Sequence, residues 1–207
     1  SGCTSLTSIT IPDSVTSISS YAFSDCDGLT NFKAGSGLKV IGRYAFYSCN
    51  KLEIVEINNE NLSTVGYQAF QYNSALKSVS ISGNGVTINE DAFYNCNSLT
   101  DVEIGKGVKT INSYAFQYCD ALESVKISDD VTTIGNYAFR YCYALANVTL
   151  GKGLTSLGTG AFYNCSKLES IVLPDSLTSI NDSVFSGCTS LKSVSIGSGC
   201  TSISSTA

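Results

Sequence analysis

Nine cysteines carry the most reactive side chains of this chain, and eight of them recur at one position of a repeated pattern. In a stacked repeat, in-register thiols point in parallel rather than at each other, which disfavours disulfides. Zinc sites need close ligand pairs such as C-x2-C, and the chain has none. We therefore expect buried free thiols, with disulfides or metal ligation as the alternatives. The eight are Cys3, Cys26, Cys49, Cys96, Cys119, Cys142, Cys165 and Cys188.

The residue types of the chain give little support for a catalytic function. The chain contains no histidine, so neither a Ser–His nor a Cys–His nucleophile pair can form. Residues 105–107 and 151–153 both read Gly-Lys-Gly and resemble phosphate-binding loops, but they lack the Gly-Lys-Ser/Thr ending and recur at turn positions. We predict that the protein is not an enzyme and has no cofactor and no metal site.

The tyrosine residues are candidates for a binding surface. All twelve tyrosines lie within four residues of a phenylalanine that recurs along the chain. Tyrosine supplies a large amphipathic area at low entropic cost, so a cluster of rings is typical of a binding surface. The alternative is a ladder of rings that only covers the repeated turns. The densest cluster, our first candidate for a ligand-binding site, is Tyr114, Tyr118, Tyr137, Arg140, Tyr141 and Tyr143.

Charged residues at outward strand positions form a second candidate. Glu56, Asp101 and Glu103 stand there, with Lys126 on a neighbouring repeat. Calcium requires about six to eight oxygen ligands, and the glycine-aspartate nonapeptide of calcium-binding repeats is absent. The simplest interpretation is a solvated sheet face. These four residues are therefore the alternative ligand-binding site.

All these residues belong to one repeated unit, whose signature is Ala-Phe-x-x-Cys. Successive Phe residues lie 23 apart, with a single interval of 24 between Phe46 and Phe70. A fixed period of roughly 20–50 residues indicates a stacked-repeat protein. The signature pair stands at Ala22-Phe23, Ala45-Phe46, Ala69-Phe70, Ala92-Phe93, Ala115-Phe116, Ala138-Phe139 and Ala161-Phe162, with Val184-Phe185 as a weakened copy.

The apolar columns of each repeat predict the elements that position these residues. With Phe as position zero, apolar residues at +9 and +11 flank a polar one, which is the alternation of a half-buried strand. A turn and a second extended piece follow. Ala, Phe and Cys have the i,i+3 and i,i+4 spacing of an inward-facing helical or 3₁₀ turn. Residues 1–207 are thus predicted to form one β-rich repeat solenoid of about nine coils, each built from these three pieces.

The pattern L-x-x-V-x-I-P/G-x-x-V-x-x-I-x-x-x-A-F-x-x-C resembles the bacterial BspA-like leucine-rich repeats. The resemblance covers the whole chain and is clearest in residues 168–185, where Pro174 occupies the proline position. It implies a leucine-rich-repeat solenoid on a secreted or surface-displayed bacterial protein that adheres to host proteins or to other cells. The motif positions are structural, so the resemblance carries no binding residue over.

The net charge, the hydropathy and the ends of the sequence narrow the kinds of partner that the protein can have. The net charge of −5 argues against nucleic acid, and no apolar run approaches the roughly 18 residues that a membrane span needs. Both ends fall inside a repeat, so we expect an uncapped piece of a longer array whose open edges favour end-to-end self-association. The predicted function is an extracellular or cell-surface module that binds a protein or glycan on a host or neighbouring cell. The alternative is a structural spacer or stalk that displays other domains.

Overall fold

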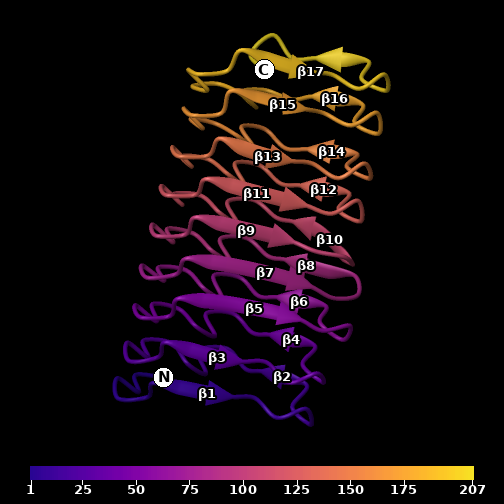
Figure 1. Cartoon of the computed structure of the whole chain (residues 1–207). Coiled ribbons are helices and arrows are strands. Elements are labelled where there is room, and N and C mark those ends of the chain that lie inside the picture. Colours follow the sequence, from indigo (N-terminus) through magenta and orange to yellow (C-terminus); the bar gives the residue numbers. More distant parts are fainter.

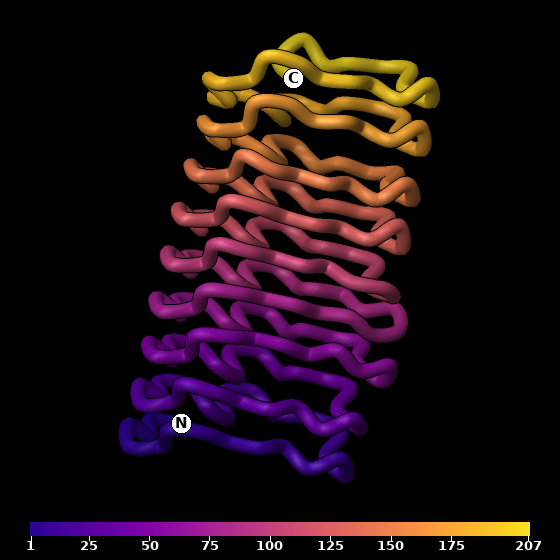
Figure 2. Tube along the Cα trace, in the orientation of Figure 1, coloured from indigo at the N-terminus to yellow at the C-terminus, as the bar shows by residue number.

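The computed structural model describes all residues, 1–207, and shows a solenoid of stacked coils with the two termini at opposite ends (Figures 1 and 2). The first strand of each coil lies on one side of the stack. These strands are β1 (Ser8–Thr10), β3 (Asn31–Lys33), β5 (Ile54–Asn58), β7 (Ser78–Ser82), β9 (Asp101–Ile104), β11 (Ser124–Ile127), β13 (Asn147–Thr149), β15 (Ser170–Val172) and β17 (Ser193–Ser195).

The second extended piece of each coil forms a shorter strand on another side of the stack. These strands are β2 (Ser17–Ile18), β4 (Val40–Ile41), β6 (Thr64–Val65), β8 (Val86–Ile88), β10 (Val108–Ile111), β12 (Thr133–Ile134), β14 (Ser156–Leu157), β16 (Ser179–Ile180) and β18 (Ser202–Ile203). The structure has no helix with the length and hydropathy that a membrane span requires.

Parallel pairing between coils keeps the repeat in register. Val102 of β9, for example, lies opposite Val79 of β7 and Val125 of β11. The odd-numbered strands form a five-stranded sheet from β5 to β13, and β1–β3 and β15–β17 pair separately. The even-numbered strands form a seven-stranded sheet from β2 to β14, and β16 pairs with β18. Because side chains alternate along a strand, this register stacks each apolar column on itself.

One continuous core fills the interior and confirms the predicted columns. It comprises 54 buried residues, and its centre is the phenylalanine stack. The ring centroids of Phe70 and Phe93 lie 5.1 Å apart with nearly parallel planes, and Phe93 and Phe116 repeat that distance. A single coil exposes such a column on both sides, so burial of each ring requires a neighbouring coil.

The predicted helical or 3₁₀ turn is wrong, because the structure contains no helix in this segment. The amides of Tyr114, Phe116 and Tyr118 donate to carbonyl groups of the next coil, the second of these to Ala138 at 2.8 Å. The intervening amide of Gln117 donates back to Tyr114 at 3.0 Å. In a helix, every amide would donate a hydrogen bond within the same coil. In this turn, alternate amides donate to carbonyl groups of the next coil instead. The turn therefore adds a third hydrogen-bonded side to the stack.

Two residues with a left-handed backbone conformation flank each such turn and prevent the backbone from continuing as a helix. Tyr114 has a φ of 59° and Tyr118 a φ of 60°, and the equivalent positions of the other coils share this conformation. Left-handed φ is uncommon outside glycine, and for a bulky side chain it is strained. The column of Tyr118 holds Asn95, Asn164 and Gly187 elsewhere, residues that tolerate this conformation well.

The first and last coils present partly open edges. Ile196, which follows β17, and Ile203 of β18 are exposed, and Ile9 of β1 is only half-buried. Interior members of the same columns, such as Ile104 and Ile111, are buried. Unpaired strand edges favour pairing with another chain. End-to-end association of this chain stays a prediction.

Candidate functional site

The cysteine column forms a buried stack of free thiols, as expected from the sequence. All nine cysteines are free, and seven of the eight column members are buried, Cys3 alone being exposed. The Sγ atom of Cys119 donates to the carbonyl of Phe93 at 3.3 Å, and the Sγ atom of Cys142 donates likewise to Phe116. No group of three His, Cys, Asp or Glu side chains is placed to hold a metal ion. The column thus packs in the core and supplies side-chain donors to backbone carbonyls.

The buried thiols of the native protein should react slowly with thiol reagents. Burial raises the pKa of the Cys49 and Cys96 thiols from 9.0 to about 12. Since the thiolate is the nucleophile, three pKa units lower its population roughly a thousandfold. A colorimetric thiol titration near pH 8 should detect rapid reaction only at exposed Cys3 and half-buried Cys200. The same titration in denaturant without reductant should detect all nine thiols; a lower count would reveal disulfides and contradict the packing.

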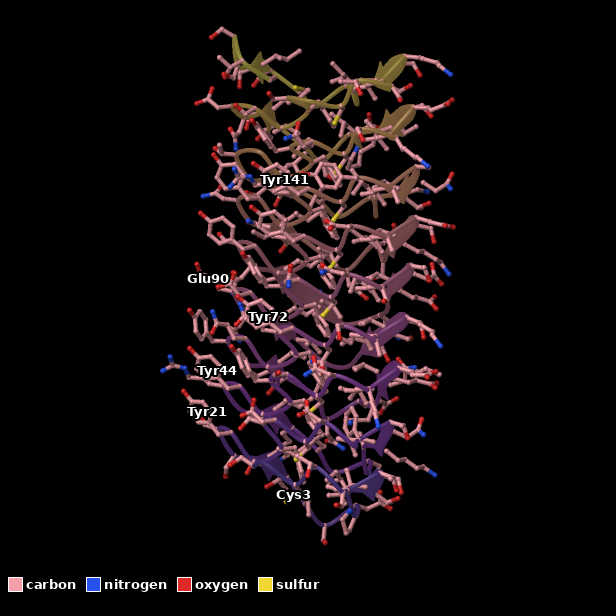
Figure 3. The ribbon with its side chains drawn as sticks, turned by 90° about the vertical axis from the view of Figure 1, so that its left-hand side faces the viewer. Cys3, Tyr21, Tyr44, Tyr72, Glu90 and Tyr141 are labelled. Carbon is pink, nitrogen blue, oxygen red and sulfur yellow. The ribbon has the colours of Figure 1, made fainter.

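The twelve tyrosines form one connected set of ring contacts, which we call the tyrosine network. Its contacting centroids lie between 4.7 and 6.5 Å apart. The labelled Tyr21, Tyr44, Tyr72 and Tyr141 mark its course along one side of the stack (Figure 3). Contacts run Tyr21–Tyr44–Tyr47–Tyr72–Tyr94–Tyr118–Tyr141–Tyr163–Tyr137–Tyr114, with Tyr67 beside Tyr44 and Tyr143 beside Tyr141.

Arg140 lies at the densest part of the tyrosine network. Its guanidinium carbon is 4.4 Å from the ring centroid of Tyr141, 5.1 Å from that of Tyr137 and 5.2 Å from that of Tyr163. One guanidinium nitrogen also donates to the Tyr141 hydroxyl at 2.8 Å. Cation–π attraction thus holds this side chain without a carboxylate, since all four ion pairs of the protein use lysine. The site keeps a net positive group among aromatic rings.

The structure brings the six predicted residues together. Tyr118 stacks on Tyr141 at 4.8 Å, Tyr141 contacts Tyr143 at 5.8 Å, and Tyr114 stacks on Tyr137 at 5.7 Å. Tyr143 is 43% exposed, whereas the other five side chains are half-buried. The rings thus cover one another in part and still present a continuous outer surface.

The predicted six-residue set omitted Tyr163, which links Tyr141 to Tyr137. Sequence reasoning also did not single out Arg43, which lies 5.1 Å from the Tyr67 ring in a second, smaller cation–π cluster. Both of the arginines in the chain therefore pack against tyrosine. The two arginines lie far apart in the sequence, so their common tyrosine environment was not noticed. A count of the arginines and tyrosines in each coil could have revealed it.

A polar hollow of about 300 Å³ adjoins the tyrosine network at Tyr67. Its other walls are Asn89, Glu90, Asn112 and Ser113, and Glu90 is labelled in Figure 3. The side-chain Nδ2 of Asn112 donates to the side-chain Oδ1 of Asn89 at 3.4 Å. The recurrence of asparagine four residues before Phe93 and Phe116 was the only sequence signal for this hollow.

The strand face holds the alternative site, and two of its four charged residues form an ion pair with each other. Lys126 contacts Glu103 at 2.9 Å, and Asp101 accepts a hydrogen bond from Ser124 on the next strand. Glu56 lies two strands from Glu103, with Ser80 of β7 between them. Register thus aligns the four residues on β5, β9 and β11, but exposed ion pairs of this kind contribute only about 0–1 kcal/mol each.

The strand face also has an apolar hollow that sequence reasoning missed. It measures about 530 Å³ and lies where β13 and β15 do not pair. Val148, Val172 and Ile196 are among its walls, and Val172 is 67% exposed. The signal was present at the outward +10 position, where Val172 replaces the polar or charged residue of most coils.

A parallel solenoid whose 23-residue coils stack columns of leucine, valine, isoleucine and phenylalanine defines a leucine-rich-repeat protein. The sequence model of the BspA type leucine rich repeat region matches residues 1–123 and 109–207. The chain therefore belongs to the BspA-type leucine-rich-repeat family. A search of curated proteins finds no match.

Several solved bacterial structures share the fold. A leucine-rich repeat protein from Eubacterium ventriosum is 22% identical and has a TM-score of 0.65 over 98% of this chain and 76% of its own. The T. pallidum leucine rich repeat protein is 20% identical, with a TM-score of 0.52 over 95% and 72% of the two chains. The pneumococcal vaccine antigen PcpA is 21% identical, with a TM-score of 0.50 over 93% and 62%.

Proposed function

We propose that this protein is a non-enzymatic binding module that acts outside the cell or on its surface. Its partner is a protein or glycan on a host or neighbouring cell. The family and the likeness to a pneumococcal vaccine antigen support this setting. The observation that carries the proposal is the tyrosine network, which places twelve rings and two arginines without carboxylate partners along the stacked turns.

The contact surface is the six-residue cluster around Arg140. Tyrosine and arginine are enriched at the centres of protein interfaces, where a single such residue contributes on the order of 2 kcal/mol. Tyr141 is held by stacking on Tyr118 and by the hydrogen bond from Arg140, so its ring is already ordered. An ordered anchor loses little entropy on binding. A protein partner therefore fits this surface best.

The strand face is the weaker candidate. Glu103 and Lys126 neutralise each other, and the remaining outward side chains are mostly serine and threonine. A partner would have to break existing pairs there and would gain few anchors. A purely structural role as a spacer is the least supported function, because a stalk does not need a continuous aromatic surface.

Replacement of Tyr118, Tyr141 and Tyr143 should weaken adhesion of the purified protein to host or neighbouring cells at least about tenfold. Tyr118 and Tyr141 should be replaced by asparagine, because Asn95 and Asn164 occupy the same left-handed column. Tyr143→Ser completes the variant. Binding would be measured as a titration of labelled protein on cells, with far-UV circular dichroism to confirm that the solenoid is intact.

The matched control removes charge from the strand face through Glu56→Gln, Asp101→Asn and Glu103→Gln. This variant should bind as the parent chain does. The opposite result, in which only the control loses binding, would assign the site to the strand face. Protease treatment of the cells should abolish binding to a protein partner, whereas sensitivity to glycosidases alone would indicate a glycan. Failure of the parent chain to bind any cell tested would favour the spacer.

A further inference from the structure

Tyr21 and Tyr44 form the closest ring pair of the tyrosine network. Their centroids lie 4.7 Å apart and their planes differ by 11°. The two residues occupy the same position of successive coils, and both have left-handed φ values of 60° and 56°. The Tyr21 amide donates to the Arg43 carbonyl at 3.0 Å, which fixes the backbones of the two coils beside the rings. Figure 3 shows the two labelled residues next to each other along one edge of the stack.

The composition leaves tyrosine as the accessible target of one-electron oxidants. The chain contains no tryptophan, methionine or histidine. Most of the thiols are buried in the core, and thiols that stay protonated react poorly. Tyr21, by contrast, is 53% exposed. Apart from the thiols of exposed Cys3 and half-buried Cys200, an oxidant at the surface therefore meets phenol groups.

We propose that the Tyr21–Tyr44 pair is a site of oxidative cross-linking, at which a peroxidase-type oxidant joins two successive coils through dityrosine. Each phenol loses one electron to the oxidant and one proton to water. The two phenoxyl radicals then couple between ring carbons ortho to the hydroxyl groups, and the two hydrogens on those carbons move to the oxygens. One hydrogen peroxide accepts both electrons and both protons and becomes two water molecules, so the reaction is balanced.

Two features favour this pair over the stacked pair of Tyr118 and Tyr141. The Arg140 guanidinium lies 4.4 Å from the Tyr141 ring and donates to its hydroxyl, whereas the Arg43 guanidinium lies farther from the Tyr44 ring, at 5.8 Å; a closer positive charge opposes loss of an electron more strongly. Tyr21 also has more than half of its surface open, which leaves its ring free to tilt as the carbon–carbon bond forms. Edge-on contacts, such as Tyr44–Tyr67 at 84°, can pass an oxidising equivalent towards Tyr44.

The cross-link would tie the coils together in a way that the cysteines cannot. The buried column holds its thiols free and in register, and six of its seven Sγ atoms donate to a backbone carbonyl. A dityrosine between residues 21 and 44 closes a loop of one repeat and restricts the unfolded chain as a disulfide does. The linked protein should therefore unfold at a higher urea concentration than the unlinked protein.

The test treats the 207-residue chain with a haem peroxidase and hydrogen peroxide at low protein concentration. Intact mass should fall by two hydrogens per molecule without dimer formation, and peptide mapping should join the peptides that contain Tyr21 and Tyr44. Tyr21→Phe and Tyr44→Phe should each abolish this product and its dityrosine fluorescence. Phenylalanine keeps the ring and the backbone conformation, so either variant should remain folded.

Tyr114→Phe is the matched control, because Tyr114 occupies the same column and stacks on Tyr137 at a longer 5.7 Å. It should leave the Tyr21–Tyr44 product unchanged. Either of two results would overturn the inference: linked dimers whose yield rises with protein concentration while the intramolecular product is missing, or an intramolecular link that survives in Tyr21→Phe. The experiment needs no binding partner, so its outcome is independent of the proposed function.

Discussion

Replacement of Phe116 by alanine should lower the free energy of unfolding by about 3–5 kcal/mol. The Phe116 side chain is fully buried, and its ring stacks between Phe93 at 5.1 Å and Phe139 at 5.3 Å. Alanine would open a cavity at the centre of the stack, with coils on both sides. Because each coil is stabilised mainly by its neighbours, the loss weakens two coil interfaces at once. Urea unfolding followed by far-UV circular dichroism would measure it.

Phe23→Ala is the matched control for position in the stack. Phe23 is only half-buried and stacks on Phe46 alone, at 5.2 Å. Its replacement should therefore cost clearly less than that of Phe116. Equal losses at the two positions would mean that the phenylalanine stack does not couple successive coils. A loss below about 1 kcal/mol for Phe116→Ala would show that the interior collapses to fill the space.

The sequence was sufficient to predict the strands and the core because both depend on side-chain periodicity. A residue such as Val102 lies inward because every second side chain of a strand does, and repetition at 23 residues confirms the alignment many times over. The boundaries of β9 and β11 follow the same columns in successive coils. A single non-repeating domain would lack this internal check.

The turn could not be predicted in the same way, because i,i+3 spacing is compatible with more than one backbone path. The distinguishing signal lay at the positions of Tyr114 and Tyr118, where other coils carry Gly160, Asn95 or Asn164. Those residues tolerate left-handed φ, but tyrosine in the same columns obscured the preference. The structure shows that hydrogen bonds to the next coil hold even the bulky side chains in that conformation.

The candidate site was predictable as a set of columns but not as a network. Contacts cross from one column to another, as when Tyr94 lies against both Tyr72 and Tyr118. Which ring meets which depends on side-chain rotamers and on the offset between coils, and neither is encoded in spacing alone. The pairing of Glu103 with Lys126 was easier to anticipate, because strand register places the two side by side.

Asn73 is the one residue of the cysteine column that is not cysteine, and it explains what the column requires. Its side-chain amide donates to the carbonyls of Phe46 at 2.9 Å and Phe70 at 2.7 Å, while its own Oδ1 is buried without a partner. Cys96, one coil later, donates its thiol to the same Phe70 carbonyl at 3.3 Å. Both residue types thus satisfy a buried backbone acceptor with a side-chain donor.

Asn73→Asp should therefore be strongly destabilising at neutral pH, by at least about 3 kcal/mol, because a carboxylate would face two carbonyl oxygens in a fully buried site. Burial and the two carbonyl dipoles should raise the pKa of the new carboxyl in the folded state above its unfolded value of about 3.9. The unfolded chain then binds fewer protons than the folded chain above that pH. Stability should consequently fall as pH rises, by up to about 1.4 kcal/mol per unit, until the folded pKa is passed.

Asn73→Cys separates this electrostatic effect from simple loss of packing. The thiol restores the residue of the other coils, donates to one carbonyl and removes the unpartnered Oδ1, so the free energy of unfolding should change by less than about 1 kcal/mol. The Asn73→Cys variant should also show no added pH dependence of stability between pH 5.5 and 7.5. A thiol that is as buried as that of Cys96 stays protonated throughout this range. Urea titrations of the two variants across that range provide the comparison. A flat pH profile for Asn73→Asp would mean that the carboxylate reaches water, and that the carbonyls of Phe46 and Phe70 do not require a buried donor.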